Sequence, residues 1–245
     1  YRRLGDFEKS IEEYQKAVEL DPRSWLVMQN MIITYNEIRK YDEALSLLER
    51  AKQNFGEEFS GQGLKIRILR NRGELDLAKN VNVGENTNDY KRITDSYLAR
   101  DVVSLRKILS NSTSEIFGSI RSYFHIDYFL GMLELFSNNT NDAKKYFSSA
   151  IKHMEKMIND YPDDPRFYAS IGLLYARIGN HELAIKYGKK ATEILPISRD
   201  AMYGPLYEKN LSMIYAILKN DSNALDKIEY LASMHSGFHY GELLL

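Results

Sequence analysis

The sequence predicts an all-α solenoid of antiparallel helix pairs, and three recurring features lead to this prediction. Six hexapeptides each begin at a turn signal and end on a small residue. The small residues that end the first three hexapeptides follow one another at intervals of 34 residues, which is the period of a two-helix repeat. A large ring stands four residues before most of the hexapeptides, and proline or glycine marks the junctions between helices. The hexapeptides are Gly5–Ser10, Arg39–Ala44, Gly73–Ala78, Asn138–Ala143, Gly179–Ala184 and Lys219–Ala224.

The small residues explain how the helices can pair closely. Tyr35, Tyr175 and Tyr215 each lie about one helical turn before a hexapeptide, so each ring needs a small neighbour on the helix that follows. Ala44 and Ala184 supply such neighbours and allow the ridges of one helix to enter the grooves of the other. The pattern therefore predicts repeated helix pairs.

At the start of the chain, the pattern predicts a helix from Asp6 to Leu20 that lacks the first helix of its pair. Without that partner, Phe7, Ile11 and Tyr14 would lose part of their cover. We therefore expect that the chain is a fragment of a longer protein, or that its open N-terminal end pairs with a second copy in a homodimer.

The middle of the chain is less regular than its two ends. Residues 82–89 are too polar to pack and predict a loop, whereas helical spacing resumes over 90–100 and 102–110. We interpret these two helices as a degenerate repeat unit, with an eroded hexapeptide at Arg100–Leu105.

The later part of the chain shows wider spacing between hexapeptides. The ring-rich run Tyr123–Phe136 predicts a core helix, because it is too short and too charged to span a bilayer. The wider spacing predicts a lengthened helix at 155–161 and a loop between units at 197–204. The resulting division has N-terminal repeat units at 1–81, the first without its first helix, a loop and degenerate unit at 82–115, and C-terminal repeat units at 116–245.

The motif residues resemble those of tetratricopeptide repeat (TPR) proteins, with the best agreement over Gly5–Pro22, Tyr35–Ala51 and Tyr168–Pro196. The resemblance implies a right-handed superhelical solenoid of about six to seven units, some of them degenerate. It also implies a scaffold for protein–protein interaction.

Some positions depart from the family motif. Asn82, Glu134 and Gly188 stand where an aromatic or aliphatic residue is expected, so we expect distorted units there and a helix loosened by Gly188. A second, shorter resemblance, over Pro196–Pro205 and the residues after Tyr230, is to repeat arrays attached to prokaryotic signalling proteins such as kinases, cyclases and winged-helix regulators. It implies a regulatory or sensor part of a larger protein.

Composition excludes several classes of protein. The chain has 245 residues, of which 44% are hydrophobic and 27% charged, and this is typical of soluble globular proteins. Its formal net charge of −1 creates no field that would attract nucleic acid or an anionic membrane. Without cysteine or a secretion signal, disulfides are excluded and a cytoplasmic location is expected.

The sequence contains no catalytic constellation, so we expect no enzyme activity, no catalytic residues and no cofactor. There is no cysteine nucleophile, no Gly-x-Ser-x-Gly elbow, no phosphate-binding glycine loop and no His-Glu-x-x-His pair. His235 and His239 are four residues apart, but Ser236 and Gly237 between them disfavour a helix. We therefore favour an ordinary surface role for the two histidines over a zinc site.

The TPR resemblance implies a binding groove, because the first helix of each unit lines the inner surface in that family. Such a groove suits an extended or helical peptide whose apolar anchors become buried. The alternative is that several of these residues pack against a neighbouring unit. Carried over position by position, the groove residues are Leu26, Gln29, Asn30, Ile33, Tyr128, Phe129, Met132, Arg166, Ser170, Leu173, Lys209, Asn210 and Met213.

Two other modes of binding have weaker support in the sequence. The family is known to clamp C-terminal carboxylates between paired lysines and asparagines, and here only Asn30, Lys209 and Asn210 resemble any part of that clamp. We therefore do not expect binding of a chaperone tail. RNA binding through the basic face at residues 65–72 is the alternative function, although a solvated helix flank is the simpler interpretation of that face.

Overall fold

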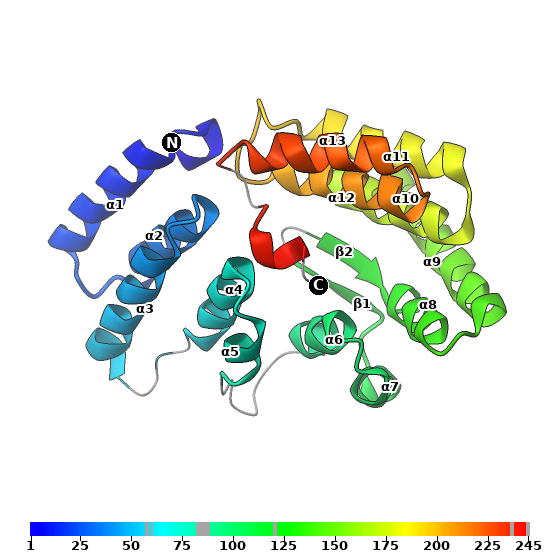
Figure 1. Ribbon diagram of the computed structural model, residues 1–245, viewed down its shortest axis with the longest axis horizontal. Helices are drawn as coiled ribbons and strands as arrows, with labels where there is room; N and C mark the ends of the chain where they lie inside the picture. The colour runs from blue at the N-terminus through cyan, green and yellow to red at the C-terminus, as the bar shows by residue number, and fades with distance from the viewer. Residues whose placement is uncertain (57–58, 60, 82–88, 120–121, 236–237, 244–245) are drawn as a thin grey trace. The chain divides into compact units, whose positions relative to one another are not determined.

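The computed structural model describes every residue except 57–58, 60, 82–88, 120–121, 236–237 and 244–245 (Figure 1). Its residues form two compact units, each of which draws on separate stretches of the chain. Unit 1 contains Tyr1–Asn86, Ser198–Pro205 and Leu231–Leu245, and unit 2 contains Thr87–Ile197 and Leu206–Tyr230. The three-part division of the sequence stays a prediction, and its loop at 82–89 lies almost wholly outside the described residues.

Unit 1 is built from α-helices that pack in chain order, each against the next. Because short turns join them, consecutive helices form the antiparallel pairs that the spacing predicts. The helices are α1 (Phe7–Leu20), α2 (Trp25–Glu37), α3 (Tyr41–Phe55), α4 (Gln62–Arg72) and α5 (Leu75–Lys79). A 3-10 helix, η1 (Arg2–Leu4), precedes α1, and another, η3 (Tyr240–Leu243), packs against α4 (Figure 1).

Unit 2 contains most of the later helices and one β-hairpin. The predicted helices over 90–100 and 102–110 are confirmed by α6 and α7, and the lengthened helix is confirmed by α9, which runs to Asp160. The elements are α6 (Asp89–Leu98), α7 (Val102–Asn111), β1 (Ile116–Ser119), β2 (Ser122–His125), α8 (Ile126–Phe136), α9 (Thr140–Asp160), α10 (Pro165–Ile178), α11 (His181–Ile194), α12 (Gly204–Ile217) and α13 (Asp221–Ala232). The predicted loop at 197–204 falls between α11 and α12.

The residues that close the hexapeptides are buried, as the pairing argument requires. Ala44 and Ala184 have no exposed surface, and Ala224 is 5% exposed. Tyr175 shares one hydrophobic cluster with Ala184, and Tyr215 shares another with Ala224. Each of these rings and its small partner on the next helix therefore belong to the same core.

The turn between paired helices has one repeated backbone conformation. The first residue of each hexapeptide adopts a positive φ. Glycine allows this conformation at little steric cost, whereas a residue with a Cβ is strained by it. The glycines are Gly5 (85°), Gly73 (92°) and Gly179 (83°), and the other residues are Arg39 (62°), Arg100 (52°), Asn138 (61°) and Lys219 (58°). The value at Arg100 shows that the turn conformation persists in the unit that we interpreted as degenerate.

The β-hairpin departs from the all-helical prediction. β1 and β2 pair antiparallel, with Phe117 opposite Phe124 and Gly118 opposite Tyr123. The predicted core helix over Tyr123–Phe136 is therefore wrong at its start, since α8 begins only at Ile126. Aromatic residues favour strands as much as buried helices, and a short apolar run does not distinguish the two by its periodicity.

Gly188 does not interrupt α11, which runs without a break from His181 to Ile194. A Cβ on Gly172 in α10 would lie 3.0 Å from the backbone nitrogen of Gly188, and a Cβ on Gly188 would lie 2.7 Å from Cδ1 of Ile214 in α12. The absence of side chains at both glycines lets α10, α11 and α12 approach closely. The expected weak point is therefore a site of dense packing.

The first helix is covered by distant parts of the same chain within unit 1. Phe7 is 2% exposed and Ile11 is 8% exposed. The backbone nitrogen of Ala201 donates to the carbonyl oxygen of Arg3 at 2.9 Å, and the His235 ring meets the Phe7 ring edge-on at 6.4 Å between centroids. The homodimer through this end stays a prediction.

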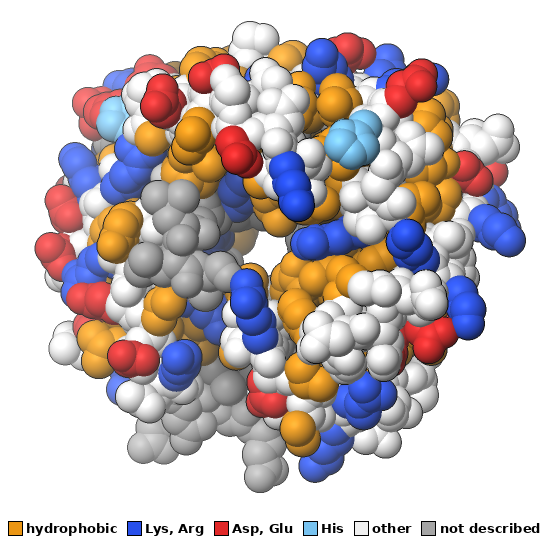
Figure 2. Space-filling model, turned by 45° about the vertical axis from the view of Figure 1, so that its right-hand side comes forward, with side chains coloured by type: hydrophobic (Ala, Val, Ile, Leu, Met, Phe, Trp, Pro, Cys, Tyr) orange, Lys and Arg blue, Asp and Glu red, His pale blue; other side chains and the backbone are white. Residues whose placement is uncertain are grey.

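The surface is mixed in character. Figure 2 shows lysine and arginine side chains interspersed with aspartate and glutamate on the face in view, in keeping with the net charge of −1. Among the described residues, no helix combines the length and the apolar character that a membrane crossing requires.

Replacing Lys219 by glycine is expected to raise the free energy of unfolding by about 1 kcal/mol, because the left-handed conformation strains a residue with a Cβ. Lys219 is exposed and adopts φ 58° in the turn after α12. The matched control is Lys189→Gly at an exposed position inside α11, where glycine is expected to lower the free energy of unfolding by about 1 kcal/mol. Denaturant unfolding followed by circular dichroism measures both; equal losses of stability would contradict the prediction.

Candidate functional site

The predicted groove residues of unit 1 form one stripe along α2. Leu26 is 67% exposed, and Gln29, Asn30 and Ile33 are half-buried. Their helical spacing places them on one face. Asn30 is already engaged, because Arg2 donates to its side-chain oxygen at 3.1 Å and its amide donates to the Leu26 carbonyl at 2.9 Å. Leu26 is the exposed apolar residue of this stripe.

The same face of α2 continues into charged and polar residues that the sequence analysis did not select. Glu37 follows Ile33 by one helical turn, and its side chain is 4% exposed and ion-paired with Arg67 of α4. Beside this pair, Asn71 donates to the side-chain oxygen of Asn36 at 3.1 Å. Both contacts tie α2 to α4. The signal in the sequence was an acid and a base 30 residues apart, close to one repeat period.

A segment from much later in the chain lies on this face of unit 1. We define residues 238–241 as the docked segment. Arg39, in the turn after α2, donates from Nε and Nη2 to the carbonyl oxygen of Phe238 at 3.3 and 3.2 Å. The backbone at Gly241 approaches α4 so closely that a Cβ would overlap the carbonyl oxygen of Arg70. The docked segment therefore contacts both first helices of the pairs in this unit.

His239 is the buried centre of the docked segment. Its side chain is 2% exposed, and its Nδ1 lies 2.9 Å from the Tyr41 hydroxyl oxygen. Its Nε2 lies 4.0 Å from a carboxylate oxygen of Glu37. The surface role that the sequence favoured for His239 is therefore wrong. The tertiary contacts that bury it come from helices almost 200 residues earlier, and no local pattern reveals them.

Five predicted groove residues of unit 2 lie in its core. Tyr128 is 4% exposed, Phe129 and Met132 are 3% exposed, and Ser170 and Leu173 are 2% exposed. The burial of these five residues agrees with the alternative interpretation of the predicted groove, in which such residues pack against their neighbours. A partner could reach them only after a rearrangement of the unit, and their binding role stays a prediction.

The β-hairpin covers two of the predicted residues on α10. Ser170 donates its hydroxyl to the carbonyl oxygen of Tyr123, and Arg166 donates from Nη1 to the carbonyl oxygen of Ser119 at 3.1 Å. The Tyr123 ring also meets the Phe167 ring edge-on, with centroids 4.8 Å apart. A segment outside the helix pairs thus lies on the predicted groove face in this unit too.

His153 of α9 packs against the same hairpin. Its Nε2 lies 3.1 Å from the Tyr123 hydroxyl oxygen, and its ring centroid lies 4.6 Å from that of His125. Burial lowers the pKa of His153, since it disfavours the charged form, and the neighbouring His125 lowers it further. This lowered pKa favours the neutral imidazole over the charged form.

The remaining predicted residues lie on α12. Lys209 and Asn210 are half-buried, and Met213 is 37% exposed. Positions 209, 210 and 213 share one side of the helix. This side of α12 is the part of the predicted groove in unit 2 that keeps an accessible apolar side chain.

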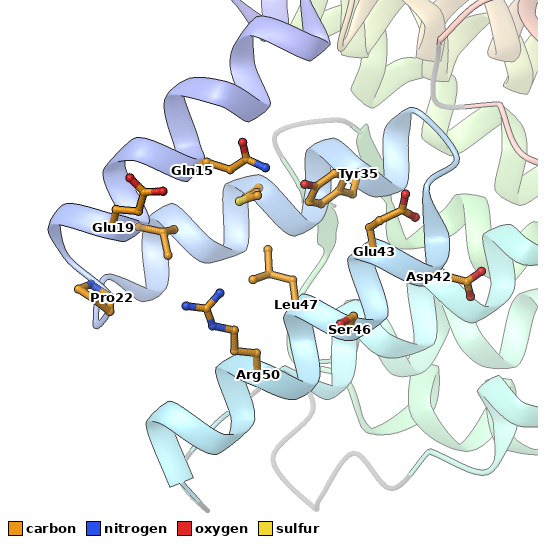
Figure 3. Close-up of a pocket in the computed structure, with 11 residues that line it drawn as sticks. Gln15, Glu19, Pro22, Tyr35, Asp42, Glu43, Ser46, Leu47 and Arg50 are labelled. Carbon is orange, nitrogen blue, oxygen red and sulfur yellow. The ribbon is translucent and has the colours of Figure 1, made fainter.

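An open pocket in unit 1 lies between α1, α2 and α3 (Figure 3). Its volume is about 690 Å³, and the lining includes Val18, Met31 and Leu47, which are 6%, 6% and 9% exposed. Glu19 of α1 and Glu43 of α3 are exposed at its rim. Figure 3 shows Leu47 projecting from α3 into the space between the helices. This pocket is not apparent from the sequence, because its residues come from second helices and turns as well as from α2.

The basic face proposed for RNA is engaged with carboxylates. Lys65 pairs with Glu49 at 2.8 Å, and Arg67 pairs with Glu37. Arg72 lies 2.6 Å from Asp42 and 2.5 Å from Glu74. These acids neutralise much of the positive charge that a phosphate backbone would need. Within the described residues, no group of three or more histidine and carboxylate side chains is placed to hold a metal ion.

Stacked helix pairs with small residues at their contacts and left-handed turns define a helical-repeat protein of the kind that binds other proteins. Two family profiles, both described as tetratricopeptide repeat, match residues 1–24 and 129–197. These two stretches of the chain therefore carry tetratricopeptide repeats.

Several curated relatives are named Hsp70-Hsp90 organizing proteins. The Hsp70-Hsp90 organizing protein of Triticum aestivum is 25% identical over 231 residues, which cover 89% of this chain and 39% of that protein. Hsp70-Hsp90 organizing protein 2 of Arabidopsis thaliana is 24% identical over 196 residues, covering 78% of this chain and 33% of that protein. The chain thus spans well under half the length of these relatives.

One solved structure is described as the crystal structure of YrrB, a TPR protein with an unusual peptide-binding site. It is 13% identical, and the match covers 89% of this chain and 90% of that chain with a TM-score of 0.31. So low a TM-score carries no structural argument, and the TPR repeats are recognised from the two profile matches and from the helix pairs.

Replacing Leu173 by aspartate is expected to lower the free energy of unfolding of unit 2 by about 3 kcal/mol or more, because the carboxylate would be buried. Met213→Asp is the matched control, since this apolar residue of the predicted groove is partly exposed and its replacement should cost less than about 1 kcal/mol. Thermal unfolding by circular dichroism compares them. Similar melting of both variants would show that burial does not distinguish the two positions.

Acidification is expected to destabilise unit 2 through His153. Because the folded-state pKa lies below the unfolded value of 6.5, the contribution is fully present above pH 6.5 and is lost as the pH falls below it. His153→Gln should therefore lose less melting temperature between pH 7.5 and pH 5 than the parent chain. His181→Gln, at an exposed histidine of α11, is the control and should behave like the parent. Parallel pH profiles for His153→Gln and the parent would contradict the assignment.

Proposed function

We propose that the chain is a protein-binding scaffold whose unit 1 holds a peptide segment of a partner in the pocket between α1, α2 and α3. The observation that carries the proposal is the combination of a buried apolar floor and an exposed acidic rim (Figure 3). The two TPR profile matches support a protein partner, as do relatives named for the organization of Hsp70 and Hsp90. Because the chain spans so little of those relatives, the proposal names no particular chaperone.

The apolar floor of the pocket indicates that the partner segment carries a large apolar side chain. Val18, Met31 and Leu47 converge from three helices, and a volume of about 690 Å³ accommodates one or two large side chains. A leucine, methionine or phenylalanine on the partner would bury its apolar surface there, which contributes about 1.5–3 kcal/mol for full burial. Methionine in the floor adapts to partners of different shape.

The acidic rim of the pocket indicates the charge of the partner segment. Glu19, Asp42 and Glu43 carry three negative charges against one positive charge on Arg50. Among the described residues, Glu19 and Glu43 take part in no ion pair, whereas Asp42 is paired with Arg72. The partner segment is therefore expected to place lysine or arginine beside its apolar anchor, since charge complementarity selects and orients a ligand.

The predicted groove residues remain part of the proposal as secondary contacts. The stripe Leu26, Gln29, Asn30 and Ile33 in unit 1, and the stripe Lys209, Asn210 and Met213 in unit 2, each keep accessible surface. A regulatory or sensor role within a larger protein, implied by the second resemblance, belongs to the same proposal. RNA binding through residues 65–72 is the weaker candidate, because its basic groups are paired with acids.

The double reversal Glu19→Lys with Glu43→Lys is expected to weaken binding of a basic and apolar peptide by about tenfold, because two attractions become two repulsions. The probe is a fluorescein-labelled synthetic peptide of alternating leucine and lysine, and the measurement is fluorescence anisotropy at low and moderate salt. Binding should weaken as salt screens the rim.

Two controls make this test specific. Glu229→Lys changes an exposed glutamate of α13 in unit 2 and should leave the affinity unchanged. A peptide in which glutamate replaces every lysine should not bind. Equal affinity of the parent and the double variant for the basic peptide would remove the pocket from the proposal, and RNA retention that survives the same variants would favour the alternative function.

A further inference from the structure

We infer that the first-helix face of unit 1, formed by α2 and α4, is a second peptide-binding surface, and that the docked segment is its intramolecular ligand. The kind of peptide that fits has an aromatic residue, then histidine, then a glycine two positions further on. This inference uses the proposed role in protein binding but concerns a surface other than the pocket of Figure 3.

The docked segment is held as a bound peptide would be held. One contact is to its main chain, from Arg39 to the Phe238 carbonyl oxygen, and it does not depend on the identity of the side chain at that position. The other is to a side chain, because His239 lies between the Tyr41 hydroxyl and the Glu37 carboxylate. Backbone contacts that give affinity and a side-chain pocket that gives specificity are typical of peptide recognition.

The pattern of exposure along the segment supports this view. Phe238 is 8% exposed and His239 is 2% exposed, whereas Tyr240 is 63% exposed. At Gly241 the backbone again meets the protein, against the backbone of Arg70. Within four positions the segment thus has two buried anchors, one residue that faces outward and one close backbone contact. This arrangement is typical of a short linear motif in a complementary site.

Contacts that do not involve the segment join α2 to α4. The Glu37–Arg67 ion pair and the hydrogen bond between Asn71 and Asn36 link α2 to α4 directly. The main hydrophobic cluster of α1 to α4 contains Met28, Ile32 and Ile68 and, among the described residues, no member of the docked segment. His239 of the segment touches this polar link at Glu37, but the hydrophobic core lies apart from the segment. The segment is therefore expected to leave while the helix pairs stay folded.

Occupation by a tethered segment regulates access by other ligands. A segment of the same chain has an effective concentration on the order of millimolar, so a free peptide of the same sequence must compete with it. A partner carrying the motif therefore binds well only when it outcompetes the tethered copy or when something else withdraws that copy.

The test uses the full chain with Gly241→Val, whose side chain cannot fit against the Arg70 carbonyl and so displaces the segment. The probe is a fluorescein-labelled synthetic peptide with the sequence of residues 234–243, followed by anisotropy. The variant is expected to bind this peptide at least about tenfold more tightly than the parent chain. Adding Arg39→Ala to the variant, or His239→Ala to the peptide, should abolish the gain.

Equal affinity of the parent and the Gly241→Val chain for the peptide would overturn the inference. A second route covers a variant that does not fold: the full chain with Phe238→Ala and His239→Ala loses both anchors without added bulk, and it should show the same gain. Unfolding of both variants, seen by circular dichroism, would show that the segment is a structural part of unit 1 and would also overturn the inference.

The pocket and this surface are distinguished by crossing the variants. Glu19→Lys with Glu43→Lys should leave binding of the residue 234–243 peptide unchanged in the Gly241→Val chain. In turn, Gly241→Val should leave binding of the leucine–lysine peptide unchanged. Failure of one assay with success of the other therefore removes only one of the two sites, and an effect of the pocket variant on the residue 234–243 peptide would contradict a separate surface.

Discussion

Close approach of paired helices is the constraint on which the rest of the structure depends. Ala44, Ala143 and Ala184 have no exposed surface, and Gly172 and Gly188 bring the backbones of α10 and α11 to the limit of contact. Extra methylene groups at such positions cost about 1–3 kcal/mol, because packed interiors have no room to expand. The pocket of unit 1 is among the surfaces that depend on this spacing, since Ala44 lies on α3, one of the three helices that line it.

The two units resemble each other in how they use the faces of their first helices. In unit 1, the docked segment lies against α2 and α4, and in unit 2, the β-hairpin lies against α10. Each of these faces is thus partly covered by chain that is not a helix pair. The pocket between α1, α2 and α3 differs from these faces, because most of its lining comes from α1 and α3, which are the second helices of adjacent pairs.

The sequence predicted the features that depend on neighbours along the chain. Ring and small residue are separated by about nine positions, and a turn by fewer, so local spacing was enough to place α1, α6, α7 and α9. It did not predict what depends on distant partners. His239 meets Tyr41 across 198 positions, and the apolar run at Tyr123 was assigned to a helix because its strand partner was not apparent.

The candidate site follows the same division. Leu26 and Ile33 were found because the motif assigns them a face, whereas Glu37 was missed although it continues that face by one turn. Its burial depends on Arg67 in the next pair, and a charge on a helix usually faces solvent. Leu173 was selected by position alone, and the packing of α10 decided that it belongs to the core.

The left-handed residue in the turn within a helix pair has a consequence for how such repeats diversify. Where that residue is not glycine, as at Arg39 and Lys219, the chain bears local strain but keeps a side chain at a fixed point of every repeat. Arg39 uses this freedom to reach Phe238, whereas glycine at positions 5, 73 and 179 has no side chain to use. Designers who replace each of these residues with a consensus glycine would gain robustness and lose side chains such as that of Arg39, which makes a long-range contact.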